Sequence, residues 1–239
     1  MPILSIVYPC YNEVDNLEQI VRKTQKAING RDIEVILVDN GSTDDTPSKL
    51  PDIIDSLSNG YFRTVRVDVN KGYGFGIMSG VRVARGEVIC WTHADLQVDP
   101  HDVIAAYDFY VSNDDWQSCI LKGKRTGRGL LDSGFTLGMT IIASSLLGVK
   151  VSDINAQPKM FFRSFLEHMP SPPSDFSLDL YTLYIARRHN VPILEYPLSF
   201  GKRVYGDAKG GGGGIFAKFR LIYRTWSYIL RLRNSIGGY

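Results

Sequence analysis

Residues 88–97, with the sequence VICWTHADLQ, decide the fold because an apolar run passes there directly into polar groups. The first four residues have the length and composition of a buried strand. Alternation along an extended backbone would place His93, Asp95 and Gln97 on one side. Open α/β sheets bind their ligands where strands leave the sheet. The stretch therefore indicates either a metal-diphosphate site or a strand end whose polar residues are solvated.

Short apolar runs alternate with segments of helical periodicity along the rest of the chain. Strands are predicted at residues 3–8, where Pro9 is expected to end the strand, and at 34–38, 62–67, 87–92, 118–121 and 191–194, with an irregular stretch at 153–162 that feeds another strand. Helices are predicted to begin at residues 12–13 and 43, and at 72–86, 101–111, 130–147 and 172–189, with Asp44 and Asp45 in the first turn of the second. This alternation predicts an α/β fold with a mostly parallel sheet flanked by helices.

The chain has 239 residues, enough for one large α/β domain with or without an appendage. A net charge of +2 argues against a general binder of polyanions, and we expect no nucleic-acid partner. Cys10, Cys90 and Cys119 match neither a disulfide framework nor a zinc site, so we predict reduced core thiols in a cytosolic protein. No signal peptide or membrane-spanning run is recognisable. We expect a cytoplasmic protein, either soluble or peripheral on the cytoplasmic face of a membrane.

Residues 210–239 are predicted to form a flexible joint of five glycines followed by a helix, joined to a domain of residues 1–209. Apolar residues at 215–230 recur at helical spacing and form one broad face, with arginines roughly opposite. Residues 202–233 carry eight Lys or Arg against one acid. Such a basic amphipathic helix can lie in a membrane interface, pack on the sheet or bind a second subunit. These alternatives, and the oligomeric state, stay open at this point.

Acceptor-rich turns follow the first two predicted strands. Tyr11 and Glu13 come after the first strand, and Asp39 opens the second turn. Because parallel neighbouring strands end at the same edge of a sheet, we expect these side chains to converge. Glu13 and Asp39 can accept hydrogen bonds from a nucleobase edge or ribose hydroxyls, and Tyr11 offers a face to a ring. Helix capping explains each turn alone equally well, but together the turns favour nucleotide binding.

Residues 70–76, NKGYGFG, form a loop with the glycine spacing G-x-G-x-G. A dinucleotide-binding fold needs G-x-G-x-x-G after its first strand, whereas this loop follows the third, so a dinucleotide-dependent oxidoreductase is disfavoured. We expect the glycines to let a helix N-terminus pack closely beneath a ligand. Gly72 is accordingly predicted to lie against the bound nucleotide, and Lys71 to be a solvated charge.

Four segments of the chain resemble, in this order, those of family-2 glycosyltransferases: YNE at 11–13, VDNGS at 38–42, ADLQ at 94–97 and RVYGDAK at 203–209. The resemblance covers residues 3–209 and is greatest to dolichol- or polyprenyl-phosphate mannosyltransferases. It implies a GT-A fold, a nucleotide-diphosphate sugar donor, a divalent metal and inversion at the anomeric carbon. It also implies that the nucleotide is bound by Pro9, Tyr11, Glu13 and Asp39, and the metal by Asp95 and Gln97.

Two residues depart from the family pattern, which usually has aspartates where this chain has His93 and Asn40. Losing a carboxylate weakens the affinity for Mg²⁺, whereas an imidazole suits Mn²⁺ or another transition metal. His93 is therefore either a third metal ligand or a hydrogen-bond partner of a donor phosphate. The expected cofactor is Mn²⁺ or Mg²⁺.

The C-terminal third adds candidate catalytic residues. Arg203 and Lys209 lie on either side of a glycine, and Arg125, on a basic loop at 122–128, is expected to join them. Such cations bind a phosphate monoester or diphosphate, unless they are only surface charges. A polyprenyl phosphate needs no strong base, because the second pKa of a phosphate monoester is about 6 and the acceptor oxygen is already anionic. Asp179 is the candidate base for a sugar hydroxyl; for a lipid phosphate it would orient the substrate.

The sequence thus predicts a metal-dependent, inverting glycosyltransferase whose acceptor is a polyprenyl phosphate. One alternative transfers to a sugar hydroxyl in the synthesis of a cell-surface polysaccharide or lipid-linked glycan. Another is a non-catalytic nucleotide-sugar-binding protein whose metal site has decayed. The expected partners are a nucleotide-diphosphate sugar, a polyprenyl phosphate or glycan acceptor, and a membrane surface.

Overall fold

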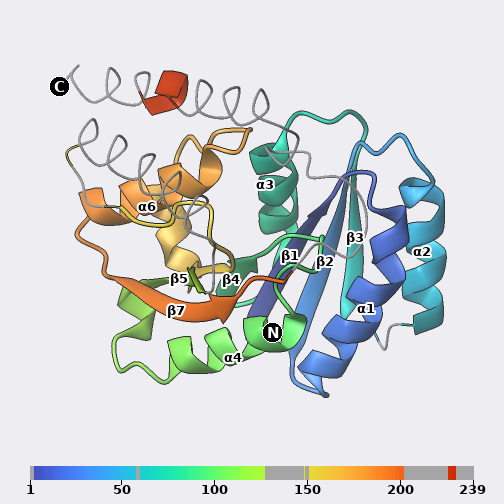
Figure 1. Cartoon of the computed structure of the whole chain (residues 1–239), viewed down its shortest axis with the longest axis horizontal. Coiled ribbons are helices and arrows are strands. Elements are labelled where there is room, and N and C mark those ends of the chain that lie inside the picture. The colour runs from blue at the N-terminus through green and yellow to red at the C-terminus, as the bar shows by residue number, and fades with distance from the viewer. Residues whose placement is uncertain (1–2, 58–59, 127–147, 149–150, 202–225, 230–239) are drawn as a thin grey trace.

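The computed structural model describes residues 3–57, 60–126, 148, 151–201 and 226–229, and its centre is a seven-stranded sheet (Figure 1). The strand order is β3-β2-β1-β4-β6-β5-β7. Neighbouring strands run parallel except β6, which is antiparallel to β4 and β5. The mostly parallel α/β sheet is therefore confirmed. The strands are β1 (Leu4–Cys10), β2 (Ile33–Asn40), β3 (Phe62–Val67), β4 (Val88–Trp91), β5 (Ile120–Thr126), β6 (Lys159–Phe162) and β7 (Ile193–Ser199).

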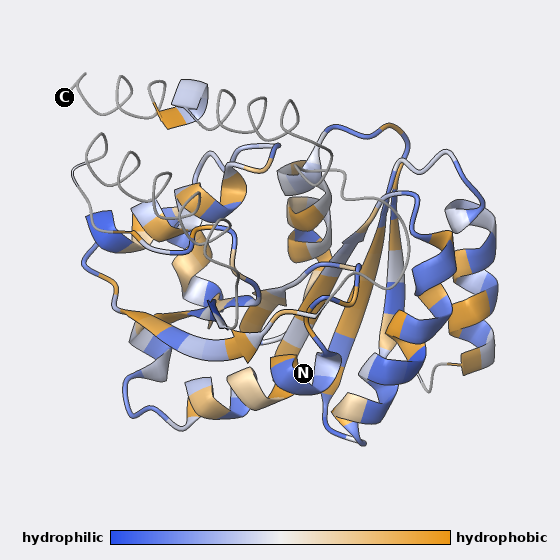
Figure 2. Cartoon of the chain, in the orientation of Figure 1, coloured by the Kyte–Doolittle hydropathy of each residue, from blue (hydrophilic) through white to orange (hydrophobic). Residues whose placement is uncertain are grey.

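Helices cover both faces of the sheet. The helices are α1 (Val14–Ile28), α2 (Thr46–Leu57), α3 (Tyr73–Val83), α4 (Pro100–Val111) and α6 (Leu178–Arg188), with short 3₁₀ helices at Trp116–Ser118 and Arg163–His168. Buried residues of α1, α2 and α4 share one hydrophobic cluster with β1 and β2. Buried residues of α3 and α6 form a second cluster, on the opposite face. Hydrophilic residues lie on the outer sides of α1 and α2, and hydrophobic ones fill the central strands (Figure 2).

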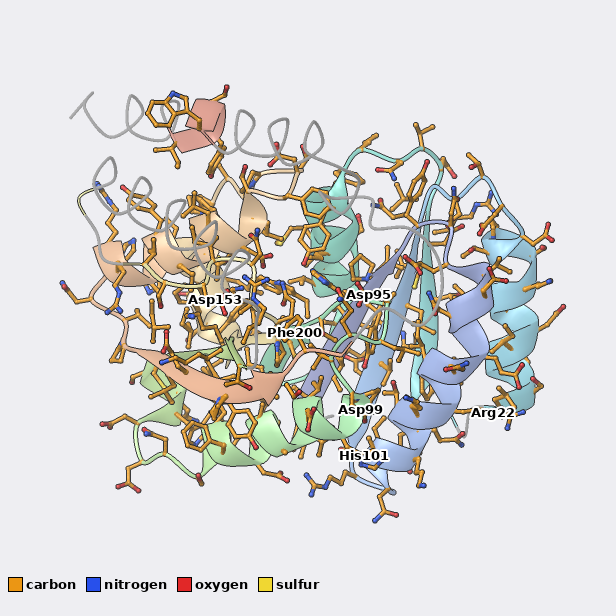
Figure 3. The ribbon with its side chains drawn as sticks, in the orientation of Figure 1. Arg22, Asp95, Asp99, His101, Asp153 and Phe200 are labelled. Atoms are coloured by element: carbon orange, nitrogen blue, oxygen red, sulfur yellow. The ribbon has the colours of Figure 1, made fainter. Side chains whose placement is uncertain are left out.

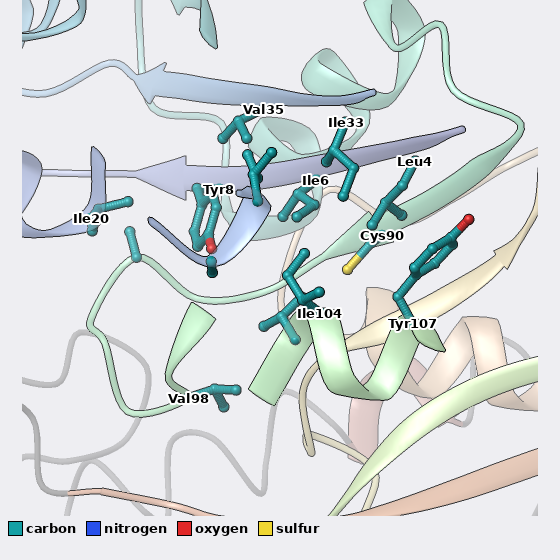
Figure 4. Close-up of a cluster of buried hydrophobic side chains, with 14 of the residues drawn as sticks. Leu4, Ile6, Tyr8, Ile20, Ile33, Val35, Cys90, Val98, Ile104 and Tyr107 are labelled. Atoms are coloured by element: carbon teal, nitrogen blue, oxygen red, sulfur yellow. The ribbon is translucent and has the colours of Figure 1, made fainter. Parts of the chain in front are cut away.

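Alternation along β1 distributes its side chains between these two layers. Leu4, Ile6 and Tyr8 belong to the α1 side (Figure 4), whereas Val7 packs with α3. All four side chains are at most 1% exposed. Burying one such side chain stabilises the fold by about 1.5–3 kcal/mol. The two layers therefore hold β1, and with it the polar turn that follows, in a fixed place.

β1 continues to Cys10, so the prediction that Pro9 ends the strand is wrong. The carbonyl of Val7 accepts a hydrogen bond from Thr92 N, so residue 7, and with it residue 9, faces the β4 side. The pairing of β1 with β4 ends at Val7 and Trp91. Pro9 lacks an N–H on the side where β4 has already ended, and a sheet tolerates proline where no neighbouring strand needs that donor.

Several other boundaries differ from prediction for identifiable reasons. β5 runs to Thr126 through the segment predicted as a basic loop, because Lys122 is buried and pairs with Glu195 at 3.0 Å. Correspondingly, β7 extends to Ser199. α2 begins only at Thr46, since Asp44 precedes the helix and accepts from Thr46 N at 2.9 Å. α6 begins at Leu178, six residues later than predicted.

The predicted helix at 130–147, the glycine joint and the domain boundary at 209 lie outside the described residues. Residues 226–229 form one helical turn, in which Ile229 is buried in the cluster of α3 and α6 and Trp226 is 39% exposed. No helix in the described ranges has the length and apolarity needed to cross a bilayer. The three cysteines are free thiols and buried, as predicted.

Candidate functional site

The carboxyl ends of β1, β2 and β4 meet at one edge of the sheet. In the parallel register Cys10 lies beside Asp39, and the turns that follow are joined by further hydrogen bonds. Asn12 N donates to Ser42 Oγ at 3.0 Å, and Thr43 N donates to Asn12 Oδ1 at 2.8 Å. The predicted convergence of the first two turns is therefore confirmed.

The two carboxylate oxygens of Asp39 differ in their hydrogen bonding. Its side chain is 3% exposed, and Oδ1 accepts from Ser42 N at 3.0 Å, which holds the turn. Oδ2 is buried without a hydrogen-bond partner among the described residues. An unsatisfied buried carboxylate oxygen is costly unless a ligand supplies a donor. Tyr11 and Glu13 lie half-buried on the adjoining turn, where Glu13 N donates to Thr46 Oγ1. Together these groups place hydrogen-bonding side chains at one edge of the sheet, and their chemistry suits a nucleoside.

Two glycines let loops approach this edge closely. Gly41 has φ of +70°, and a Cβ there would overlap the backbone at Asn70. Gly72 has φ of +114°, and a Cβ there would overlap the carbonyl of Ser174. Both positions therefore require glycine for conformation and for space. The contact of Gly72 is with Ser174, so its contact with a nucleotide stays a prediction.

Residues 93–97 form a turn, so the extended arrangement predicted for them is wrong. Leu96 has φ of +57°, and Asp95 Oδ1 accepts from Gln97 N at 3.1 Å, which closes an Asx turn. The turn still brings His93 Nδ1 within 3.9 Å of Asp95 Oδ2. The Gln97 amide nitrogen donates to Gly201 O at 3.3 Å, and Gly201 N donates back to Gln97 O. These two hydrogen bonds connect the turn to the segment that follows β7. Asp95 lies near the middle of the molecule (Figure 3).

The two residues that depart from the family pattern contact successive residues at the start of α3. Asn40 Nδ2 donates to Gly72 O at 3.0 Å, a bond that a carboxylate could not form. His93 Nε2 lies 3.1 Å from Tyr73 Oη. Tyr73 was not singled out from the sequence, although it lies within the glycine loop that was.

Asp179 is buried in a polar network beneath this edge. It is 1% exposed, and its Oδ1 accepts from Trp91 Nε1 at 3.1 Å. Gln157 Nε2 lies 3.0 Å from each Asp179 oxygen, and Lys159 Nζ lies 3.5 Å from Oδ1. Burial lowers the pKa of Lys159 to about 8 against the opposing charge of Asp179. Gln157 and Lys159 escaped sequence reasoning because they lie in the stretch predicted as irregular.

Of the predicted phosphate-binding cations, Arg125 lies within the described residues. Arg125, on β5, is paired with Asp153, whose Oδ1 accepts from Arg125 Nε at 2.7 Å. Its guanidinium carbon also lies 5.6 Å from the ring centre of Phe200. Arg125 would have to exchange the Asp153 carboxylate for a phosphate in order to bind one. Arg203 and Lys209 lie outside the described residues, so their roles stay predictions.

Comparison with known proteins accounts for this arrangement of turns. The model of glycosyl transferase family 2 matches residues 5–169, more than half of the chain. The chain belongs to glycosyl transferase family 2. This confirms the family that the sequence motifs resemble.

Two relatives of this family-2 chain align with nearly all of it. A dolichol-phosphate mannosyltransferase of Pyrococcus furiosus is 28% identical over 235 residues, 94% of this chain and 64% of that protein. An undecaprenyl-phosphate 4-deoxy-4-formamido-L-arabinose transferase of Pseudomonas fluorescens is 26% identical over 245 residues, 98% of this chain and 68% of that protein. The chain therefore spans just under two thirds of the length of the Pyrococcus relative.

Solved structures of glucosyl-3-phosphoglycerate synthase from Mycobacterium tuberculosis share the fold. The complex with Mn²⁺, UDP-glucose and phosphoglyceric acid has a TM-score of 0.74 at 15% identity, covering 98% of this chain and 80% of that chain. The complex with Mg²⁺ and UDP has a TM-score of 0.73 at 17% identity, covering 97% and 79%. At such identities the likeness shows the fold alone, and it confirms the GT-A fold that the motifs imply.

The donor set of this family-2 site fits a divalent metal that is shared with a diphosphate. It comprises the Asp95 carboxylate, the His93 imidazole and the Gln97 side chain. Within the described ranges, no group of three His, Cys, Asp or Glu side chains forms a metal cage by itself. Mg²⁺ in nucleotide enzymes is usually held by one or two carboxylates together with substrate phosphates. Asp95 and His93 thus suit a metal whose remaining ligands come from the donor and water.

Proposed function

We propose that this chain is an inverting glycosyltransferase that transfers a sugar from a nucleotide-diphosphate sugar to a polyprenyl phosphate with the aid of a divalent metal. Membership of glycosyl transferase family 2 supports the reaction class. The names of the two long-matching relatives, which specify dolichol phosphate and undecaprenyl phosphate, support the acceptor class.

One observation carries the donor half of the proposal. The buried Oδ2 of Asp39, which has no hydrogen-bond partner among the described residues, lies at the end of β2, and the pair of Asp95 and His93 follows β4; both strands run parallel to β1, which lies between them. Asp39 would accept an N–H of the base, with Glu13 and Tyr11 beside the nucleoside. Asp95 and His93, with Gln97, would hold the metal, which offsets charge on the departing nucleoside diphosphate.

The burial of Asp179 favours a phosphate acceptor over a sugar hydroxyl. A general base must reach the proton that it removes, but Asp179 is 1% exposed and both of its oxygens already accept hydrogen bonds. A phosphate monoester oxygen is already anionic near neutral pH, since its second pKa is about 6. It would attack the anomeric carbon as the bond to the donor diphosphate breaks, which inverts that carbon. Arg203 and Lys209 would balance the negative charge of the acceptor. Asp179, buried below the site, would have only an orienting role.

The test is transfer by the purified full chain. Undecaprenyl and dolichyl phosphates in detergent would be offered with UDP- and GDP-sugars and Mn²⁺ or Mg²⁺, and glycolipid product measured by mass spectrometry. We expect metal-dependent product with at least one donor, and a loss of about a hundredfold or more in Asp95→Ala, comparable to removing a group that stabilises developing charge. Tyr110→Phe is the matched control and should keep activity. The Tyr110 hydroxyl donates to Cys119 O and accepts from Phe162 N, away from the proposed site.

Three outcomes would contradict the proposal. Product formation that survives Asp95→Ala refutes the metal assignment. Transfer to free glycans but not to lipid phosphates refutes the acceptor. Donor binding without transfer to any acceptor indicates a nucleotide-sugar-binding protein instead.

A further inference from the structure

The turn that carries Asp95 is joined to the segment after β7 through a single residue, Gln97. Gly201 N donates to Gln97 O at 2.9 Å, and the Gln97 amide nitrogen donates to Gly201 O at 3.3 Å. On the other side, Asp95 Oδ1 accepts from Gln97 N at 3.1 Å. Gln97 therefore contacts Asp95 with its backbone N–H, and Gly201 with both its backbone carbonyl and its side chain.

The orientation of the Gln97 side chain follows from the chemistry of its partner. A backbone carbonyl can only accept, so the carboxamide nitrogen must face Gly201 O. The carboxamide oxygen then points elsewhere, and it is the atom of Gln97 that can bind a metal in the site proposed above. A carboxamide whose oxygen binds a cation is polarised toward that oxygen, which makes its N–H a stronger donor. Occupation of the metal site should therefore strengthen the hydrogen bond to Gly201.

The segment after β7 also contacts Arg125, the candidate cation for the acceptor phosphate. Leu198 is 3% exposed and its carbonyl accepts from Thr126 Oγ1 at 3.0 Å, so β7 is fixed up to this residue. Phe200 (Figure 3) packs against the cluster that contains Leu198, and its ring centre lies 5.6 Å from the guanidinium carbon of Arg125. Because Phe200 directly precedes Gly201, a firmer hold on Gly201 also restricts Phe200 and the Arg125 side chain beside it.

Resting on the function proposed above, we infer that Gln97 couples the donor site to the acceptor side of the enzyme. Its carboxamide oxygen binds the donor's metal while its nitrogen holds Gly201, so that an occupied donor site fixes Phe200 beside Arg125. Toward the acceptor, Gln97 is a positioning residue, since it acts there through Gly201. Coupling between two binding sites is reciprocal, so an acceptor phosphate should in turn raise the affinity for metal and nucleotide.

Hydrogen exchange at Gly201 tests the coupling without any turnover. The Gly201 amide is one of the two donors, so its exchange rate reports the contact directly. The rate would be followed by mass spectrometry on the full chain, with and without Mn²⁺ and UDP or GDP. We expect metal and nucleotide together to slow this exchange about tenfold, within the usual range of coupling between two sites. Calorimetry on the same samples measures binding of Mn²⁺ and nucleotide independently.

Gln97→Glu separates the two roles of the side chain. Glutamate keeps an oxygen for the metal but has no N–H, and its carboxylate would repel Gly201 O. The variant should still bind Mn²⁺ with nucleotide, whereas exchange at Gly201 should no longer slow and the KM for undecaprenyl phosphate should rise about tenfold. Gln117→Glu makes the same chemical change at an exposed position before β5 and should behave as the unsubstituted chain.

Two substitutions at Gly201 decide the question if Gln97→Glu does not fold or bind metal. Gly201→Pro removes the N–H that donates to Gln97 O, and it should raise the KM for undecaprenyl phosphate about tenfold while Mn²⁺ affinity is kept. Gly201→Ala keeps both backbone groups, and its Cβ would lie 3.6 Å from Gln97 O, an ordinary contact, so its KM should not change. An unchanged KM in Gly201→Pro overturns the coupling.

The results also separate the coupling from the proposed function. If Mn²⁺ and nucleotide bind to the unsubstituted chain but exchange at Gly201 is unchanged, the coupling is overturned while the proposed function stands. If exchange slows equally in Gln97→Glu, the carboxamide nitrogen is not the link, and the inference is again overturned. If neither UDP nor GDP binds with Mn²⁺ or Mg²⁺, the donor half of the proposed function fails, and the inference fails with it.

Discussion

His93 and Asn40 stand where family-2 chains usually have aspartates, and each contacts a residue at the start of α3. The Asn40 amide donates to Gly72 O, whereas a carboxylate would repel that carbonyl. His93 reaches Tyr73 with one ring nitrogen while the other faces Asp95. The two departures are therefore compatible with a working site, since both secure the start of α3. They do not require the decayed site considered from the sequence.

His93→Asp should change the metal preference of the site. The substitution replaces an imidazole by a hard carboxylate and removes the contact with Tyr73. Since hard oxygen ligands favour Mg²⁺, the ratio of Mg²⁺ to Mn²⁺ affinity should rise by about tenfold. Calorimetric titration of each metal with the same nucleoside diphosphate measures this ratio. His101→Asp introduces the same charge change at an exposed position on α4 and should leave the ratio unchanged; an unchanged ratio in His93→Asp would show that His93 does not contact the metal.

The sequence was sufficient for residues whose chemistry is visible locally. Asp39 and Asp95 follow buried strands, and that position alone marks them as ligand-binding candidates. The importance of Tyr73, Gln157 and Lys159 depends on network partners that lie 20 to 84 residues away in sequence. No local pattern encodes such contacts, so these residues could not be predicted. The burial of Asp179 could not be predicted for the same reason, because the residues that bury it, Trp91 and Gln157, are distant in sequence.

At the scale of elements, the decisive contact joins the N-terminus of α3 to the segment before α6. A Cβ on Gly74 would overlap the carbonyls of Pro173 and Asp175, so only glycine allows this approach. That segment leads directly into α6, where Asp179 occupies the first turn. The glycine loop therefore does permit close packing of a helix N-terminus, as predicted. Its described neighbour is a protein segment, and this segment places Asp179 next to the start of α3.

Gly74→Ala should disturb the site more than an equally crowded substitution elsewhere in α3. The added methyl group must displace residues 173–175, and overpacking of this kind costs about 1–3 kcal/mol of unfolding free energy. Because Tyr73 shifts with them, Mn²⁺ affinity with nucleotide should also fall. Gly80→Ala, which crowds Val7 and Val38 in the core, should lose comparable stability but keep Mn²⁺ affinity. Urea unfolding measures the loss of stability, and calorimetry measures the Mn²⁺ affinity. Equal Mn²⁺ affinity in both variants would show that displacing the start of α3 does not affect metal binding.

Strand prediction failed where a buried charged residue has an ion-pair partner on another strand. Residues 122–126 of β5 read as a basic loop, yet Lys122 is 1% exposed and pairs with Glu195 on β7. Apolar periodicity detects strands through their contact with a hydrophobic core. It cannot detect a strand whose side chains are neutralised by a neighbour that is 73 residues away in sequence.

At the scale of the whole molecule, ion pairs join neighbouring strands in two parts of the sheet. β3, β2, β1 and β4 are parallel, the carboxyl ends of β1, β2 and β4 lead into the proposed donor site, and Arg63 on β3 pairs with Glu34 on β2 at 3.2 Å. β5 and β7 are held in addition by ion pairs, with Glu195 lying 3.0 Å from both Lys122 and Lys124. Glu195 on β7 thus joins this strand to β5.

Glu195→Gln should remove part of the acid sensitivity of the fold. Burial opposes ionisation of Glu195, but hydrogen bonds from Ser152, Lys124 and Lys122 outweigh it and lower its pKa from 4.5 to about 2. A carboxyl whose pKa is lower in the folded state stabilises the protein above its unfolded pKa, and that contribution is lost as pH falls from 4.5 to about 2. The variant should therefore be less stable than the unsubstituted chain by about 1 kcal/mol at pH 6, the scale of a partly exposed ion pair, and the difference should vanish near pH 2.

Urea unfolding at several pH values between 2 and 6 measures this convergence. Glu18→Gln removes a well-exposed helical ion pair with Arg22 and should give a difference close to zero throughout. A Glu195→Gln difference that is independent of pH would mean that the lost stability comes from packing or neutral hydrogen bonds. In that event the charge on Glu195 would not be what joins β5 to β7, and the buried Lys122 would need another source of stabilisation, because an uncompensated buried ammonium group is strongly destabilising.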